Sequence, residues 1–290
     1  MAKGSVAVVR RRAIVPAMST DRLAPGRHPG PVRHALSKVP EVTVYFWVIK
    51  VLTTGMGETS SDYLVFHINP YIAVALGGIG LAVSLLLQLL VRRYIAWIYW
   101  LAVVMVAIFG TMAADVVHIV LGVPYLVSSV VFAAALAIIF VSWYATEKTL
   151  SIHSIYTLRR ELFYWAAIMA TFALGTAVGD LTATTVRLGS TASLGYFASG
   201  VLFAVLFALP ALGYWLFRLN AIFAFWFAYV MTRPLGASFA DWFGKPRSAS
   251  GLGLGTGLIS LILAAVIVGF VGYLTVTHKD IKDTTTTPRG

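Results

Sequence analysis

Cysteine is absent from this 290-residue chain, and Asp, Glu, Lys and Arg together make up only 11% of it. The missing cysteine excludes disulfides, thiolate-bound metals and a thiol nucleophile. The scarcity of charge excludes an ordinary soluble domain, which carries roughly 25% charged residues. The chain also has no phosphate-binding loop, no His-Glu-x-x-His motif and no Gly-x-Ser-x-Gly motif. We therefore expect no enzymatic activity and no bound cofactor.

Apolar residues dominate instead, at 59% of the chain, with a mean hydropathy of +0.85. This composition is typical of an integral membrane protein, whose main partner is the lipid bilayer. The net charge of +11 does not indicate a nucleic-acid partner, because eight of the 22 Lys and Arg residues precede residue 41. Most of the others lie at the ends of apolar segments, as the excess of positive charge on the cytoplasmic side of membrane proteins predicts.

Eight segments are long and apolar enough to cross a bilayer, which takes about 20 residues. We expect an all-α polytopic membrane protein with eight transmembrane helices at about residues 42–63, 70–91, 95–118, 123–144, 162–183, 193–216, 220–242 and 252–276. The basic residues place both termini in the cytoplasm. Aromatic residues that end the even-numbered segments, such as Trp143 and Tyr144, are expected at the membrane interface.

A motif with fixed spacing occurs four times along the chain. An aromatic-Trp pair is followed by a Gly ten residues after the Trp, and by an Asp five residues later. The copies are Phe46, Trp47, Gly57 and Asp62; Tyr99, Trp100, Gly110 and Asp115; Tyr164, Trp165, Gly175 and Asp180; and Phe225, Trp226, Gly236 and Asp241. Fixed spacing indicates an internal repeat. Two spans per copy make the repeats parallel, related by an axis along the membrane normal.

The expected domain organisation follows from this repeat. The segments are a disordered basic cytoplasmic tail at 1–40, in which Met18 is a second candidate start, an eight-helix membrane domain at 41–277 and a polar tail at 278–290. The repeats cover about 41–92, 95–145, 160–217 and 220–277. The longest connector, residues 145–161, is expected to form an interfacial helix between two halves of two repeats.

Each motif Gly precedes a small residue by four positions. In lipid this spacing lets helices approach closely, so we expect the four glycines to pack helices together. The same motif contributes carboxylates. Five of the eleven acidic residues fall inside predicted spans: Glu58, Asp62, Asp115, Asp180 and Asp241. Charged groups there cost about 2.5–3.5 kcal/mol and therefore indicate a functional site.

The depth of these carboxylates can be predicted from helix geometry. Each Asp follows its Trp by fifteen residues, which is about 22 Å along a helix. With the four Trp residues near the cytoplasmic face, the four Asp residues and Glu58 should form one carboxylate cluster beyond the midplane.

Two bases lie within the predicted spans. Arg233, followed by the helix-disrupting Pro234, is the candidate internal counterion. Lys50 is the second, and its long side chain can extend to the cytoplasmic surface. His118 lies three residues after Asp115, on the same helical face, and is a candidate ligand or proton relay. Nearby Thr and Ser hydroxyls are either neutral oxygen ligands or ordinary interhelical hydrogen-bond formers.

Several stretches carry a family resemblance: KVPEVTVYFWVIKVLTTGMGETSSDYL at 38–64, TEKTLSIHSIYTLRRELFYW at 146–165, ALGTAVGDLTA at 173–183 and MTRPLGASFADW at 231–242. They resemble a family of uncharacterised bacterial polytopic proteins, described only as membrane-anchored. That family consists of four tandem repeats of unknown function, each with two transmembrane regions and a characteristic Trp. The resemblance covers about residues 38–277. It implies the architecture and a bacterial inner membrane, but no activity and no functional residues.

Charge counting leads to the functional hypothesis. Five acids against two bases leave three negative charges uncompensated. Because like charges in a low dielectric repel strongly, protons or a cation are expected to occupy the cluster. We expect a small-cation transporter with proton coupling, and oxygen-only ligands favour a hard divalent metal. The alternative is a non-transporting scaffold or sensor whose repeated acids hold the helices together.

Overall fold

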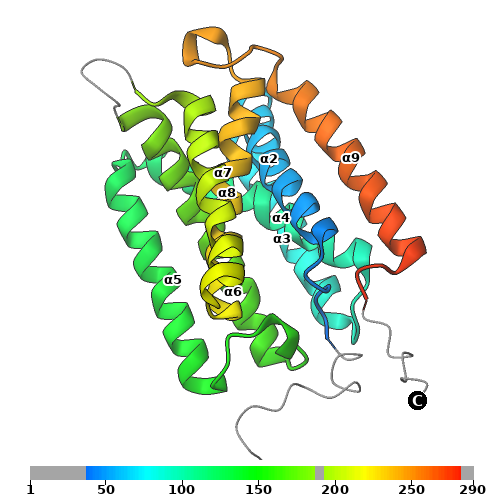
Figure 1. Ribbon diagram of the computed structural model, residues 1–290. Helices are drawn as coiled ribbons and strands as arrows, with labels where there is room; N and C mark the ends of the chain where they lie inside the picture. The colour runs from blue at the N-terminus through cyan, green and yellow to red at the C-terminus, as the bar shows by residue number, and fades with distance from the viewer. Residues whose placement is uncertain (1–36, 187–192, 282–290) are drawn as a thin grey trace, which may run out of the picture.

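The computed structural model describes residues 37–186 and 193–281, and within these ranges every regular element is a helix (Figure 1). The eight α-helices there are α2 (Val44–His67), α3 (Pro70–Leu90), α4 (Ala96–Asp115), α5 (Tyr125–Glu147), α6 (Leu158–Asp180), α7 (Gly195–Phe217), α8 (Ala221–Gly244) and α9 (Thr256–Thr277). Each matches one predicted segment to within a few residues. The expected all-helical architecture of eight helices is therefore confirmed.

Local chemistry sets the helix boundaries. Thr43 and Thr157 are extended N-cap residues whose hydroxyls accept a backbone N–H of the first turn of α2 and α6. Helices α5, α7 and α9 each end at a C-cap residue with a left-handed backbone. These residues are Lys148, Arg218 and His278. A left-handed C-terminal residue terminates a helix by turning the backbone away from its axis.

Four helices form a closed inner ring. Helix α2 packs on α4, α4 on α6, α6 on α8, and α8 on α2. These are the first helices of the four repeats, and α2 and α8 run in the same direction while α9 runs in the opposite one (Figure 1). The second helix of each repeat lies outside this ring and packs on the inner helix of the next repeat. These outer-helix contacts are α3 on α4, α5 on α6, α7 on α8, and α9 on α2. Every repeat therefore covers its successor, and the last repeat covers the first.

The motif glycines lie at the contacts of the inner ring. The Gly ten residues after each Trp faces the residue seven after the Trp in the next repeat. The pairs are Gly57 with Ala107, Gly110 with Phe172, Gly175 with Arg233, and Gly236 with Thr54. A Cβ on Gly57 would lie 2.5 Å from Ala107 Cβ, and one on Gly236 would lie 1.9 Å from Thr54 Oγ1. The glycines therefore permit backbone approach that no larger residue allows.

The motif aromatics fill the end of the ring at which the inner helices begin. Trp100, Trp165 and Trp226 are buried in the main apolar cluster. The hydroxyls of Tyr99 and Tyr164 hydrogen-bond to each other at 2.5 Å across α4 and α6. Trp143 also lies in this cluster and is fully buried, so it packs against protein and does not face lipid.

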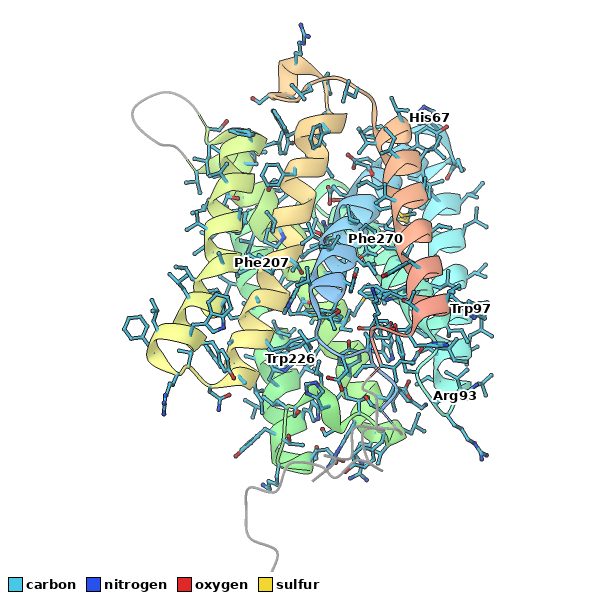
Figure 2. All side chains as sticks on the ribbon, turned by 45° about the vertical axis from the view of Figure 1, so that its right-hand side comes forward. His67, Arg93, Trp97, Phe207, Trp226 and Phe270 are labelled. Atoms are coloured by element: carbon cyan, nitrogen blue, oxygen red, sulfur yellow. The ribbon has the colours of Figure 1, made fainter. Side chains whose placement is uncertain are left out.

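Six helices of the described chain are long and apolar enough to cross a membrane, namely α3, α4, α5, α6, α7 and α9. This is the composition of a multi-pass membrane protein. Helices α2 and α8 have 24 residues each but carry the polar side chains of the ring interior. In Figure 2, His67 at the end of α2 and Arg93 beyond the end of α3 mark opposite ends of the bundle.

Three local expectations need correction or restriction. The connector 145–161 contains a single 3₁₀ turn at Ile152–Ser154 and no interfacial helix, since α5 and α6 extend into both of its ends. Residues 37–40, assigned to the N-terminal tail, pack against the bundle, where Lys38 pairs with buried Glu161 at 2.5 Å. The remainder of both predicted tails, residues 1–36 and 282–290, lies outside the described residues.

Candidate functional site

One guanidinium lies at the centre of the ring. Arg233 on α8 is fully buried. Its Nη2 lies within hydrogen-bonding distance of Glu58 Oε2 at 2.6 Å, Thr111 Oγ1 at 2.5 Å and Thr176 Oγ1 at 2.7 Å. Its Nη1 donates to the Thr54 carbonyl at 3.5 Å. Arg233 therefore joins α8 to the other three inner helices.

The partners of Arg233 occupy one position of the repeat. The residue eleven after each motif Trp is Glu58, Thr111, Thr176 and Ala237 in the four copies. The first three all face the guanidinium supplied by the fourth repeat. The predicted counterion Arg233 thus pairs with one predicted acid, Glu58. Sequence analysis missed Thr111, which aligning the repeats on their Trp residues would have identified.

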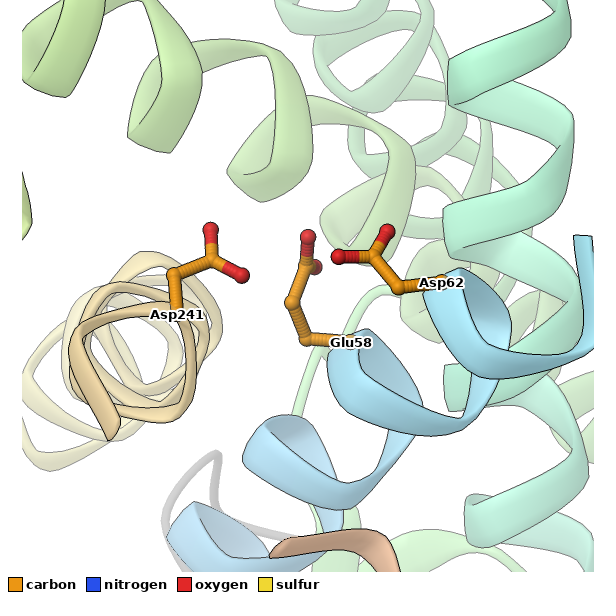
Figure 3. A group of neighbouring side chains, drawn as sticks. All are labelled: Glu58, Asp62 and Asp241. Atoms are coloured by element: carbon orange, nitrogen blue, oxygen red, sulfur yellow. The ribbon is translucent and has the colours of Figure 1, made fainter. Parts of the chain in front are cut away.

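Glu58 also belongs to a group of three carboxylates, which lies toward the end of the ring far from the Trp residues. Glu58 and Asp62 on α2 and Asp241 on α8 each place one oxygen within 4.8 Å of the others. Figure 3 shows the three carboxylate groups converging between the two helices. Glu58 and Asp241 are buried, and Asp62 is half-buried. Oxygen donors at such separations suit a hard cation.

Lys245 approaches the same group from beyond the end of α8. Its Nζ lies 3.1 Å from Asp241 Oδ2 and 3.6 Å from Asp62 Oδ2. Burial alone would lower the pKa of Lys245, but the carboxylates of Asp241 and Asp62 outweigh it and raise the pKa well above its ordinary value. Lys245 is therefore charged at neutral pH. Lys245 is not among the predicted site residues, although its four-residue spacing from Asp241 is typical of an ion pair.

The other two motif acids stand apart from this group. Asp115 and Asp180 are half-buried and have no hydrogen-bond or ion-pair partner for their side chains in the described chain. Both lie within electrostatic range of Glu58. Three of the five predicted acids, Glu58, Asp62 and Asp241, therefore lie close enough to share one ion, and a common role for all five stays a prediction. At Asp115 and Asp180 the α-helix gives way to a π-helical turn, at 116–120 and 181–185, whereas α2 and α8 continue as α-helix.

The π-helical turn also changes the position of His118. Its Nδ1 lies 3.2 Å from the Val123 carbonyl and 3.4 Å from Ser128 Oγ, and its ring packs on Tyr125 with centroids 4.3 Å apart. Its ring forms no hydrogen bond or ion pair with Asp115 among the described residues. A direct Asp-His pair does not form, because a π-helix has wider turns than the α-helix on which the spacing argument relied, and a role of His118 as a ligand or proton relay stays a prediction.

Lys50 lies deeper in the ring than expected. It is 1% exposed, and its Nζ lies 4.1 Å from the centroid of Phe172 and 4.3 Å from that of Tyr229. Its ammonium has no hydrogen-bond acceptor in the described chain. The expectation that Lys50 extends to the aqueous surface is therefore wrong. Its Nζ lies over two aromatic faces, a position that stabilises a desolvated ammonium by roughly 2 kcal/mol when the group is protonated.

These features define an all-helical, multi-pass membrane protein with fourfold internal repetition and a polar ring interior. A family model matches the chain four times, at residues 45–94, 98–149, 163–220 and 224–280. The chain belongs to this family, the Repeat of Unknown Function DUF347. Each matched unit contains one inner and one outer helix. No curated protein and no solved structure matches the chain.

Proposed function

We propose that the protein is a proton-coupled transporter of a small cation in the bacterial inner membrane. All eight helices cross the bilayer, and both termini are cytoplasmic. The observation that supports this most directly is the convergence of Glu58, Asp62 and Asp241 within the membrane domain. Buried carboxylates are costly there, and they mark ion pathways in membrane proteins.

The enclosure of α2 and α8 supports eight spans. Each contacts two inner helices and at least one outer helix, so its polar residues face protein rather than lipid. Polar side chains inside a bundle are compatible with a transmembrane helix when they pair with one another. Both helices have 24 residues, which is long enough to span, and Arg233 pairs with Glu58 between them.

The bound ammonium of Lys245 suggests how a cation would enter. Lys245 follows the last residue of α8 and holds Asp62 and Asp241 together. An incoming cation would displace this ammonium and take its carboxylate partners. Asp115 and Asp180, which have no ion-pair partner in the described chain, would accept or release the coupled protons. A hard divalent ion fits a site made of carboxylate and hydroxyl oxygens.

Flux in proteoliposomes tests this proposal. The double variant Asp62→Asn and Asp241→Asn should abolish uptake of divalent cations and the accompanying proton movement. The matched control is Arg93→Gln, which changes an exposed charge at the other end of the bundle. Wild-type flux in the double variant would rule the proposal out.

A scaffold or sensor role is the second candidate, and the central position of Arg233 favours it. The guanidinium connects all four repeats through Glu58, Thr111 and Thr176, as a structural link would. In that case the double Asn variant should change the unfolding temperature in detergent, while no cation stabilises the wild-type protein. Concentration-dependent stabilisation by a cation, lost in the double variant, would favour transport.

A further inference from the structure

A pocket separates α5 from α8 at the end of the bundle where α8 begins. Its volume is about 530 Å³, within the range of about 300–1,000 Å³ for small-molecule sites. The apolar side chains of Phe140, Trp226, Val230 and Met231 line it. The indole N–H of Trp226 donates to the Leu150 carbonyl at 2.9 Å. The indole N–H of Trp226 thus has its hydrogen-bond partner, and the side chain contributes apolar surface to the pocket.

The rim of this pocket carries hydrogen-bond donors and positive charge. Lys148 and Asn220 both line the rim and are exposed. The adjacent acid, Glu147, is paired with Arg159 and Arg160 at 3.7 and 2.7 Å. The charge of Lys148 is therefore left without an acidic partner in the described part of the chain.

Asn220 adds a donor and a favourable field. Its Oδ1 caps α8 by accepting the N–H groups of Ile222 and Phe223 at 2.9 and 3.2 Å, which leaves its amide NH₂ group directed at no acceptor among the described residues. The rim also lies at the positive end of the 24-residue helix α8. An anion at the rim and an apolar chain in the interior would satisfy both parts of the pocket.

We propose that this pocket binds one anionic phospholipid. The phosphate lies between Lys148 and the start of α8, and an acyl chain enters between α5 and α8 against Trp226. A lipid fits because the lining combines apolar depth with a basic rim at the ends of two helices, where headgroups meet acyl chains. This site is separate from the carboxylates and independent of any transport activity.

Fluorescence quenching by brominated lipids tests the proposal in the detergent-solubilised full chain. Brominated phosphatidylglycerol should quench a saturable component of the tryptophan emission that is missing in Trp226→Phe. Lys148→Gln should weaken this component about fivefold, the effect of one lysine charge near an anionic lipid. Brominated phosphatidylcholine should bind more weakly than phosphatidylglycerol and be unaffected by Lys148→Gln. Arg93→Gln is the matched control, because it removes one exposed charge from the same end of the bundle.

Val230→Phe fills the apolar part and should eliminate the component for both lipids. Equal quenching by the two lipids would overturn the proposed anion selectivity. Saturable quenching that Lys148→Gln and Val230→Phe both leave unchanged would overturn the site itself. Because Lys148 is exposed and ends its helix, Lys148→Gln is expected to fold and gives a result even where Val230→Phe does not.

Discussion

The inner and outer helices of this bundle differ in which side chains they bury and which they expose. The outer helices α3, α5, α7 and α9 are apolar around most of their surface and expose large hydrophobic side chains such as Leu90, Val141 and Trp215. The inner helices α2 and α8 bury ionisable residues, among them Lys50, Glu58 and Arg233. The exposed apolar side chains of the outer helices suit contact with lipid, whereas the buried side chains of α2 and α8 are surrounded by protein. A helix enclosed by other helices can therefore carry charges that would prevent an isolated helix from crossing a bilayer.

The largest disruption of this contrast should come from the centre of the ring. Arg233→Met leaves Glu58 buried without a partner, and breaking a buried pair in this way costs about 3–5 kcal/mol. We expect a correspondingly lower unfolding temperature in detergent. Adding Glu58→Gln should recover part of the loss because it removes the isolated charge. If Arg233→Met unfolds at the wild-type temperature, the guanidinium does not hold the ring together.

Loss of the ion pairs that Lys245 forms with Asp241 and Asp62 should have the second-largest effect on the free energy of unfolding. Lys245→Gln removes a charged hydrogen-bond donor to Asp241 and the ion pair with Asp62, and hydrogen bonds to charged groups contribute about 1.5–3 kcal/mol. The raised pKa of Lys245 fixes the sign of the pH dependence. Its contribution is complete below the ordinary lysine pKa and is lost only as pH rises through the higher folded value. Unfolding measured from pH 7 to pH 10 should therefore show a constant difference between variant and wild type.

Paired glycine substitutions sharpen the comparison between the two layers. Gly57→Ala in α2 forces a Cβ to within 2.5 Å of Ala107, and overpacking of this kind costs about 1–3 kcal/mol. Gly269→Ala in α9 is the matched control, since its Cβ would meet nothing within 4 Å. The control should gain up to about 1 kcal/mol from helix propensity. Equal effects at the two positions would show that the inner ring is not closely packed.

The smallest effect is expected at the aromatic end of the ring. Tyr99→Phe removes the hydrogen bond to Tyr164 and keeps the ring volume, which should cost about 1 kcal/mol. Tyr144→Phe is the control, because Tyr144 is 57% exposed on an outer helix. Chemical unfolding of the two variants under the same conditions measures the difference.

The axial arrangement of the protein was predictable from its sequence. Apolar length located the helices, and the Trp-Gly-Asp spacing ordered the repeats. Both signals depend on distance along a helix, which residue number determines. The role of Arg233 as an internal counterion also followed from composition, because few bases were available to the buried acids, but the choice of Glu58 as its partner did not.

Which side chains of neighbouring helices meet inside the ring was not predictable in the same way. The spacing along a helix does not determine which side chains meet around the ring, and only Glu58, Asp62 and Asp241 bring their carboxylate oxygens within 4.8 Å of one another. The π-helical turns after Asp115 and Asp180 have no clear signal in the sequence. Lys50 was misplaced because a long side chain can reach water or remain on aromatic faces, and only the packing of Phe172 and Tyr229 decides between them.

The packing of each repeat on its successor makes the order of the repeats cyclic. Helix α9 covers α2 as α3 covers α4, although no peptide connects the fourth repeat to the first. A head-to-tail interface whose rotation closes generates a ring regardless of which units are covalently linked. The molecule thus has the cyclic contact order of a ring of four two-helix subunits joined in tandem. A circular permutant that begins at the second repeat should form the same ring, with the asymmetric Glu58–Arg233 pair still at its axis.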